Sequence, residues 1–150
     1  MNSVYPQVRV KIVNPDAPMP KFSRDGDAGV DLCSMEDVTI EPFGTVMVGT
    51  GISMAIPRGF EGTIRPRSGM AAKRGVTIAN APGTIDSNYR GEIMLPLYNM
   101  RSEPVTVNKG ERVVQLLIKA QPEPTFVEAD SLDETNRQDS GFGSSGYGRL

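Results

Sequence analysis

Short alternating segments, separated by turn residues, constrain the fold of this chain more than any other feature. In residues 8–12, for example, apolar and basic side chains alternate, as expected for a strand with one buried face. The 16 glycines and 12 prolines supply the breaks between such segments. The segments that we expect to be strands are residues 8–12, 38–40, 45–48, 51–56, 60–65, 76–79, 93–98, 105–107 and 112–118. Regularly spaced short strands predict an all-β fold, here a jelly-roll-like β-barrel.

Turn and helix signals connect these strands. Residues 41–44 (EPFG) predict a turn, and residues 108–111 (NKGE) predict the turn of a β-hairpin. Pro96 cannot donate a backbone hydrogen bond, so we expect its strand to lie at an edge or to contain a bulge. The one short helix should include residues 70–73. It would be capped by Ser68 and would end at Gly75.

The composition changes in the last part of the chain. We expect residues 1–129 to form one β-barrel domain, because 150 residues are enough for a single core. Residues 130–150 are polar and rich in Gly and Ser, which predicts a flexible C-terminal arm. Within this arm Arg137 could bind a phosphate, and Phe142, which is flanked by glycines, could stack on a planar ring. A solvated tail with an incidental aromatic residue is the alternative.

The amino-acid inventory excludes several kinds of chemistry. The chain has no histidine, so Ser-His-Asp catalysis, Cys-His catalysis and His-based zinc sites are excluded. Proton transfer must then use a carboxylate, Lys, Tyr or a metal-bound water. Hydrolysis by an aspartate-oriented water, with a hard cation such as Mg²⁺, stays open. The single cysteine, Cys33, is expected to pack as a small apolar residue in a reducing cytoplasm.

Charge and hydropathy limit the partners that we expect. The formal net charge of −2 argues against stable, nonspecific binding to nucleic acid. No apolar stretch is long enough to span a membrane, and no N-terminal segment has the pattern of a signal peptide. We therefore expect a cytoplasmic protein that does not bind a membrane.

Residues 80–93 (NAPGTIDSNYRGEI) hold the strongest local signal of a ligand site. Turn residues stand beside Ile85, Tyr89 and Ile93, and one carboxylate, Asp86, lies among them. This mixture predicts a β-hairpin whose walls form a pocket, with backbone groups free to bind a flat ligand. An ordinary tight hairpin with an Asx-type turn at Asp86 explains the same residues. The segment alone does not decide between the two interpretations.

Five short segments form a second pattern along the chain. They are residues 27–32 (DAGVDL), 66–71 (PRSGMA), 83–92 (GTIDSNYRGE), 110–116 (GERVVQL), and Arg137 with 141–146 (GFGSSG). In this order they resemble the trimeric dUTP pyrophosphatase (dUTPase) family, from about Asp27 to Gly146. One such segment could arise by chance, whereas five in register form a specific signal.

The resemblance implies that the chain hydrolyses dUTP to dUMP and pyrophosphate, supplying dUMP for thymidylate synthesis and keeping uracil out of DNA. Asp86 would orient and deprotonate the water that attacks the α-phosphorus. Mg²⁺ would be the cofactor, bound to Asp31 through water. The residues implied to bind the substrate are Arg67, Ser68, Gly69 and Gln115 for the phosphates, Asn80, Gly83, Thr84 and Ile85 for the uracil edge, Tyr89 for the deoxyribose, Met94 for the nucleotide, and Arg137, Phe142 and Gly143 for closing the site.

The resemblance also implies a homotrimer whose sites lie at subunit boundaries. Residues 121–124 (QPEP) independently suit an extended arm that leaves its own barrel and completes a neighbour's site. The chain departs from the family pattern at two places. Asn88 stands where the family has a second acidic residue, which leaves Asp86 as the one carboxylate there. Residues 138–140 (QDS) stand where glycines usually follow the arginine, and this bears on how the arm closes.

Other interpretations stay open. Asp31 could anchor a turn, and Gln115 could be an ordinary polar residue of a strand. A dCTP deaminase-like enzyme has a similar fold and a similar Ile-Asp turn, but it uses a glutamate at the position of Pro96. A noncatalytic regulator that is switched by nucleotide binding is a third hypothesis.

Overall fold

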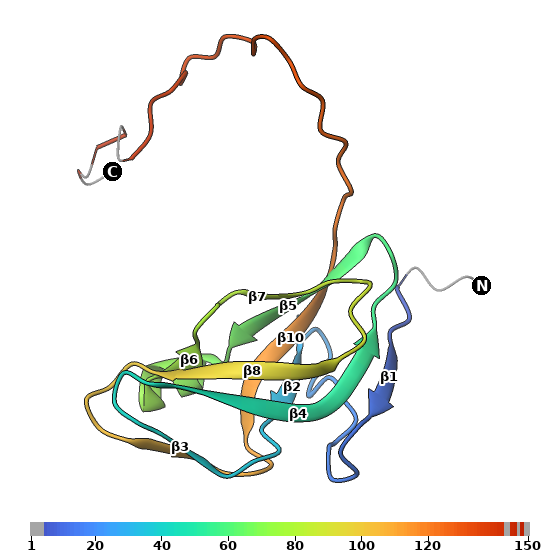
Figure 1. The fold of residues 1–150 in the computed structure, drawn as a ribbon, viewed down its shortest axis with the longest axis vertical. Helices are drawn as coiled ribbons and strands as arrows, with labels where there is room; N and C mark the ends of the chain where they lie inside the picture. Colours follow the sequence, from blue (N-terminus) through green and yellow to red (C-terminus); the bar gives the residue numbers. More distant parts are fainter. Residues whose placement is uncertain (1–4, 143–144, 147, 149–150) are drawn as a thin grey trace.

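The computed structural model describes residues 5–142, 145–146 and 148, and its folded part consists of ten β-strands and one short helix (Figure 1). The prediction of a mainly β fold with one short helix is confirmed. The elements are β1 (Arg9–Ile12), β2 (Val30–Cys33), β3 (Val38–Ile40), β4 (Thr45–Ala55), β5 (Phe60–Pro66), η1 (Met70–Arg74), β6 (Val76–Ile78), β7 (Gly83–Ile85), β8 (Glu92–Asn99), β9 (Val105–Val107) and β10 (Arg112–Ala120).

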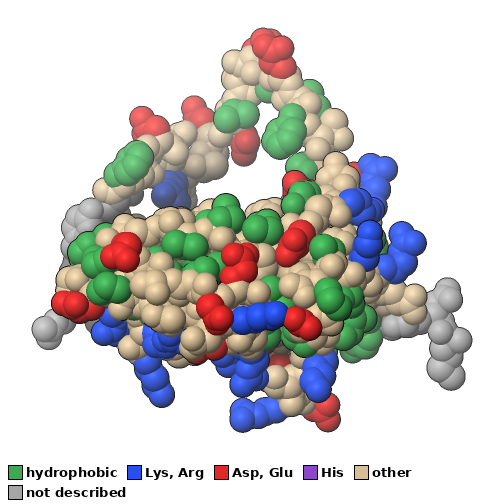
Figure 2. All heavy atoms as spheres, turned by 60° about the horizontal axis from the view of Figure 1, so that its bottom comes forward, with side chains coloured by type: hydrophobic (Ala, Val, Ile, Leu, Met, Phe, Trp, Pro, Cys, Tyr) green, Lys and Arg blue, Asp and Glu red, His purple; other side chains and the backbone are tan. Residues whose placement is uncertain are grey.

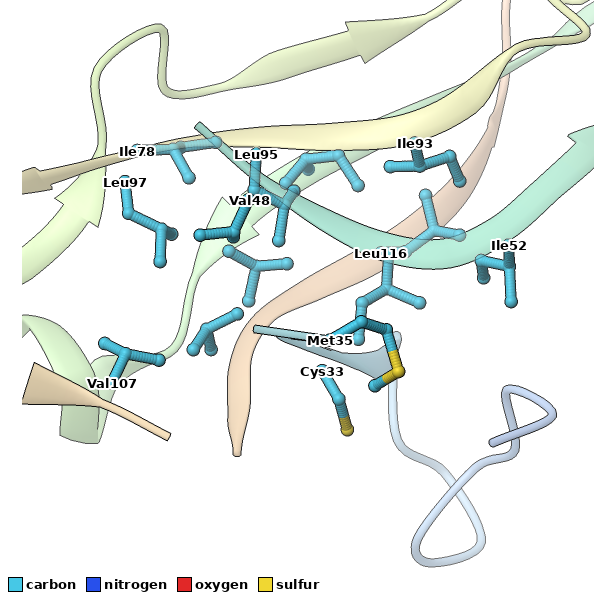
Figure 3. Packing of buried hydrophobic residues seen from close by; sticks show 14 of the residues in the cluster. Cys33, Met35, Val48, Ile52, Ile78, Ile93, Leu95, Leu97, Val107 and Leu116 are labelled. Atoms are coloured by element: carbon cyan, nitrogen blue, oxygen red, sulfur yellow. The ribbon is translucent and has the colours of Figure 1, made fainter. Parts of the chain in front are cut away.

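The strands pair in three antiparallel sheets. One four-stranded sheet has the order β1-β4-β8-β6, and the other has the order β2-β10-β5-β7. The third sheet is the pair β3-β9, in which the Thr39 and Thr106 hydroxyls lie 3.3 Å apart. Within the described ranges, hydrogen bonds do not close these sheets into one barrel. The core lies between the two larger sheets, where their buried side chains point toward one another (Figure 3).

Strand β8 shows how the alternation in the sequence builds this core. Ile93, Leu95 and Leu97 are buried, whereas the residues between them face outward. Burying one such side chain contributes about 1.5–3 kcal/mol to stability. Figure 3 shows these side chains packed against those of β4 and β10. The outward face of β8 is therefore backed by a rigid core.

The two strands predicted at residues 45–48 and 51–56 are one long strand, β4, with an irregularity at its middle. Gly49 pairs with Met94 and Ser53 pairs with Glu92, so four residues of β4 advance beside two of β8. Gly51 makes this bulge possible, with a φ of 71°. A Cβ at Gly51 would lie 2.7 Å from the Ala17 side chain, so the position requires glycine for space as well.

Both predicted hairpins are instead connections between sheets. The turn at residues 108–111 forms, because the Glu111 N–H donates to the Asn108 carbonyl at 3.0 Å. However, β9 pairs with β3, and β10 pairs with β2 and β5. Likewise β7 pairs with β5, whereas β8 pairs with β4 and β6. The hairpin predictions were wrong because each strand finds its partner through distant packing, which turn chemistry does not specify.

Pro96 lies in an interior strand, so the predicted edge position was wrong. The predicted alternative, a bulge, does occur in the pairing of β8 with β4, but it lies between Glu92 and Met94 and not at Pro96. The carbonyl of Pro96 accepts the N–H of Ala79 at 2.8 Å, just beyond the end of β6. The N–H that proline lacks would point the same way, past the last residue of β6. The sheet therefore accepts Pro96 without losing a hydrogen bond inside the β6-β8 ladder.

The short helix ends as predicted but begins differently. Gly75 has a φ of 67°, and its N–H donates to the Met70 and Ala71 carbonyls. At the other end the N-cap is Gly69, and no side chain makes a capping hydrogen bond there. The prediction that Ser68 caps the helix was therefore wrong, because the backbone is already helical at Gly69, with φ −66° and ψ −37°.

Beyond β10 the described chain runs as an exposed segment without strand or helix. Figure 1 shows this segment leaving the end of β10 and passing away from the sheets. On the face shown in Figure 2, basic and acidic side chains are interspersed, with hydrophobic side chains scattered among them. In the part of the chain that the structure describes, no helix has the length and apolar character needed to cross a membrane.

Candidate active site

A pocket of about 200 Å³ lies between β7 and β8, and we call it the Asp86 pocket. Residues from both larger sheets line it, because the chain crosses between the sheets at this point. Seven of the residues predicted for the site meet here: Asn80, Gly83, Thr84, Ile85, Asp86, Tyr89 and Met94. Pro96 lines the same pocket.

The floor of the Asp86 pocket is apolar and its mouth is polar. Ile64, Ile78 and Leu95 are buried beneath it, whereas Asp86 is exposed. A Cβ at Gly83 would lie 3.3 Å from the Cβ of Ile64, so any larger residue there would intrude on this space. The pocket thus suits a ligand with apolar faces, and one carboxylate stands at its edge.

Strand β7 leaves backbone groups available to such a ligand. It is the last strand of its sheet and pairs with β5 alone among the described strands. Antiparallel pairing on one side occupies only part of a strand's N–H and carbonyl groups. The groups on the free side are therefore available to a ligand, at the strand formed by Gly83, Thr84 and Ile85, for which the family resemblance implies contact with the uracil edge.

A second pocket is charged, and we call it the Asp31 pocket. Its lining includes Asp31, Arg67, Ser68, Arg112 and Gln115. The two oxygens of Asp31 bind different arginines: Oδ1 lies 3.1 Å from Nε of Arg67, and Oδ2 lies 3.2 Å from Nη1 of Arg112. Arg67 also donates from Nη1 to the Arg112 carbonyl at 3.0 Å. The carboxylate of Asp31 is only 20% exposed, so these contacts are partly shielded from water.

Strand pairing explains why these distant segments meet. Asp31 on β2 is the register partner of Gln115 on β10, and Gln115 is the partner of Arg65 on β5. Gln115 also donates from Nε2 to the carbonyl of Pro66, at 3.3 Å. Arg67 follows directly after β5, which places its guanidinium beside Asp31. The predicted phosphate-binding residues Arg67, Ser68 and Gln115 are thus brought together, while Gly69 follows as the N-cap of η1.

The lone cysteine, Cys33, lies near the Asp31 pocket, in surroundings that disfavour its thiolate form. Burial raises the pKa of the Cys33 thiol above its ordinary value, and the nearby Arg112 only partly opposes this effect. A raised pKa lowers the fraction of thiolate, which is the nucleophilic form, at neutral pH. Cys33 is part of the core, as the sequence predicted.

Comparison with known proteins identifies the family of this chain. The family model described as dUTPase matches residues 15–146. The chain belongs to the dUTPase family. The deoxyuridine 5'-triphosphate nucleotidohydrolase of Rhodococcus erythropolis is 49% identical over 142 residues, which cover 93% of this chain and 85% of that protein. The corresponding protein of Finegoldia magna is 43% identical over 93% of this chain and 100% of its own length.

Solved dUTPase structures share the fold. A mutant dUTPase of Staphylococcus bacteriophage 80alpha, solved with dUpNHpp, has a TM-score of 0.86 to this chain. It is 27% identical, and the match covers 94% of this chain and 99% of the phage chain. The resemblance drawn from the five segments is therefore confirmed at the level of family and fold.

The Asp86 pocket and the Asp31 pocket share no lining residue. Asp31 lies in β2 and Asp86 directly follows β7, and these two strands are the opposite edges of the sheet β2-β10-β5-β7, three strand spacings apart. The register also offsets them along β5, because Asp31 aligns with Arg65 whereas Ile85 aligns with Gly62. With strands about 4.8 Å apart and residues about 3.3 Å apart, the two backbones are separated by roughly 20 Å. The chain does not bring these two predicted groups together.

The predicted residues of the C-terminal arm are also apart from both pockets. Arg137 donates from Nε to the Ser140 carbonyl at 2.9 Å, within a local turn. Phe142 is fully exposed, and neither residue lines the Asp86 pocket or the Asp31 pocket. Gly143 lies outside the described residues.

Two residues of the site region were given no role by sequence analysis. Arg112 holds Asp31, and Glu92 accepts the N–H of Gly51 through Oε1 at 2.8 Å. Both lie inside segments that carry the dUTPase resemblance, which was the available signal. Their partners could not be identified beforehand, because each partner belongs to a strand that is remote in sequence.

Proposed function

We propose that this dUTPase hydrolyses dUTP to dUMP and pyrophosphate with Asp86 as the group that activates water. The observation that carries this proposal is the Asp86 pocket, where one exposed carboxylate lines a cavity with a buried apolar floor. An ionised carboxylate can orient a water molecule and accept its proton. The enzyme has no histidine to do this work.

We assign the uracil to the Asp86 pocket. Its faces would contact the apolar floor, and its polar edge would bind Asn80 and the free backbone groups of Gly83, Thr84 and Ile85. Met94 would cover the nucleotide from β8, and Tyr89 would pack against the deoxyribose. This orientation directs the triphosphate out of the pocket and past Asp86.

We assign the triphosphate to the Asp31 pocket. Arg67 and Gln115 line it with N–H donors, and the backbone at Ser68 and Gly69 adds the amides that begin a helical turn. A Mg²⁺ ion fits the donor set, since Mg²⁺ is commonly held by one or two carboxylates together with substrate phosphates and its own waters. Asp31 would hold such an ion through water. The ion would supply charge neutralisation of the triphosphate.

The mechanism needs no covalent intermediate. The carboxylate of Asp86 takes a proton from the water as its oxygen attacks the α-phosphorus. The bond from that phosphorus to the bridging oxygen of the β-phosphate breaks, and pyrophosphate leaves. Arg67 stabilises the negative charge on the leaving group, and such electrostatic stabilisation is a major part of phosphoryl-transfer catalysis.

The separation of the pockets supports a shared site. The roughly 20 Å between the backbones of Asp31 and Asp86 exceeds the length of a triphosphate chain. Sites shared between subunits would let one nucleotide use both groups from different chains. We propose a homotrimer in which each site combines the Asp86 pocket of one subunit with the Asp31 pocket of another.

The C-terminal arm would complete this shared site. Its exposed segment leaves the sheets after β10 and carries Arg137 and Phe142 away from the pockets of its own chain. We propose that residues 130–150 form a flexible arm attached to the domain of residues 1–129, and that it orders over bound nucleotide. Arg137 would then bind the γ-phosphate, Phe142 would stack over the base, and Gly143 would allow close approach. We also propose a cytoplasmic location.

A dCTP deaminase is the second candidate, and one observation speaks against it. Pro96 lines the Asp86 pocket at the position where that family uses a glutamate for proton transfer. Proline has no group that can exchange protons. A nucleotide-switched regulator without catalysis is the third candidate.

One turnover assay tests these proposals. Purified protein is incubated with Mg²⁺ and either dUTP or dCTP, and pyrophosphate and ammonia are measured. We expect pyrophosphate from dUTP alone. Ammonia from dCTP would support the deaminase, and no product from either nucleotide would support the regulator.

A further inference from the structure

The ring of Tyr89 is held in place although it lies in an exposed loop. The side chain is 44% exposed, so burial does not fix it. Its hydroxyl donates a hydrogen bond to the Glu92 carbonyl at 2.9 Å, and its backbone N–H donates to the Asp86 carbonyl at 3.0 Å. Both ends of the residue are therefore tied to the segment that surrounds the Asp86 pocket.

Gly91 leaves the space that the Tyr89 ring occupies. A Cβ at Gly91 would lie 2.4 Å from Oη and 2.6 Å from Cζ of Tyr89. Such distances are below van der Waals contact, so any other residue at this position would displace the ring. The φ of Gly91 is not in the left-handed region, which means that the requirement is for space and not for backbone freedom.

Glu92 connects the same ring to the core. Its Oε1 accepts the N–H of Gly51 at 2.8 Å, inside the bulge of β4. The hydroxyl of Thr50, which is buried, donates to the Ile93 carbonyl at 2.8 Å. The start of β8 is thus fastened to the bulge by two hydrogen bonds, and the carbonyl that receives the Tyr89 hydroxyl is fixed with it.

We propose that Gly91 and Glu92 are positioning residues for sugar selection. Gly91 provides the space for the Tyr89 ring. Glu92 fixes the position of that ring, because its carboxylate bonds to Gly51 in the β4 bulge while its carbonyl accepts the Tyr89 hydroxyl. A ring held in this way blocks a ribose 2′-hydroxyl, whereas a ring free to tilt admits it. The inference rests on the proposed role of Tyr89 against the deoxyribose, and it adds two residues that do not touch the substrate.

The test compares kcat/KM for dUTP with kcat/KM for UTP in the full-length enzyme. Tyr89→Ala sets the scale, and Tyr89→Phe removes only the bond to Glu92. We expect Gly91→Ala to lower the ratio of kcat/KM for dUTP to kcat/KM for UTP about tenfold, and Glu92→Ala to lower it about fivefold. In both variants the main cause should be a higher kcat/KM for UTP. Glu92→Gln keeps a carbonyl oxygen for the Gly51 N–H, so it should change the preference less than about twofold. Thermal unfolding of each variant controls for loss of fold.

The outcomes separate this inference from the proposed function. If Tyr89→Ala retains the wild-type preference, the sugar is selected elsewhere and the role proposed for Tyr89 fails. If Tyr89→Ala loses the preference but Gly91→Ala and Glu92→Ala keep it, Tyr89 selects the sugar without their help and the inference is overturned. Gly91 is exposed, so Gly91→Ala keeps the test decisive even if Glu92→Ala does not fold.

Discussion

The Asp86 pocket and the Asp31 pocket are built by different physical means. The first is a cavity between two sheets, backed by buried aliphatic side chains and edged by one exposed carboxylate. The second consists of charged side chains at the ends of strands, held by ion pairs from Asp31 to Arg67 and Arg112. Shape and free backbone groups suit the first to a base, whereas charge suits the second to phosphates. Substitutions in the two pockets should therefore have different kinetic signatures.

The largest effect should come from Asp86→Asn. Asparagine keeps the shape of the side chain but cannot accept the proton, so kcat should fall by about 10³-fold, within the range for loss of a general base. Binding of dUpNHpp should remain near that of the wild type. Rapid-quench turnover and calorimetric binding measure the two quantities. A variant with near-normal turnover would show that another group activates the water.

Subunit mixing tests whether the two pockets act on one nucleotide from different chains. Asp86→Asn subunits are mixed with subunits truncated before Arg137, and subunit exchange is verified by mass spectrometry. Mixed trimers would contain sites with an intact Asp86 from one chain and an intact arm from another. We expect dUTP hydrolysis well above that of either parent. Exchange without recovery would mean that each arm closes on its own subunit.

Asp31→Asn should affect the charged pocket selectively. Loss of the carboxylate should raise the Mg²⁺ concentration needed for half-maximal activity by about tenfold, as is typical when an outer partner of a metal is removed. Binding of dUMP in the absence of Mg²⁺ should change little, because the Asp86 pocket is unaltered. If Mg²⁺ dependence is unchanged, Asp31 serves only as an anchor for the two arginines.

The smallest effect concerns Glu111, at the turn that leads into Arg112. Burial alone would raise the pKa of Glu111, but the Asn108 N–H and the Arg74 guanidinium overcome this and hold it below its ordinary value of 4.5. The ionised Glu111 carboxylate therefore stabilises the folded protein above about pH 4.5, and this stabilisation is lost as the pH falls through the lowered pKa of Glu111. Glu111→Gln should lower the free energy of unfolding by about 0.5 kcal/mol at pH 7, since the ion pair between Arg74 and Glu111 is partly exposed.

Denaturant unfolding of wild type and Glu111→Gln across pH 3–7 checks this prediction. The difference in unfolding free energy should shrink as the solution is acidified below about pH 4.5. A difference that does not vary with pH would show that Glu111 acts through its shape and not through its charge.

Local patterns in the sequence predicted most of the strands. Alternation marks which side chains of a strand face the core, and this is a property of neighbouring residues. Ile93, Leu95 and Leu97 are buried in the pattern that the sequence indicates. The turns at residues 41–44 and 108–111 form for the same local reason, with hydrogen bonds of 2.9 and 3.0 Å.

Strand partners could not be obtained in this way. The turn at 108–111 joins two strands that pair elsewhere, and Pro96 lies in an interior strand because β6 ends beside it. The anchoring of Glu92 to Gly51 and of Arg112 to Asp31 has the same origin. Each depends on a contact between residues that are distant in the chain.

The sequence by itself determined that this chain is a mainly β protein of the dUTPase family, and it singled out residues 80–93, which include Asp86, as a candidate ligand site. Those features follow from the order and type of neighbouring residues. Only the tertiary structure decided that the pocket lies between two sheets and that Asp31 belongs to the opposite edge of one of them. The physical reason is that side-chain periodicity specifies the faces of a strand, whereas the packing of the whole core selects the strand beside it.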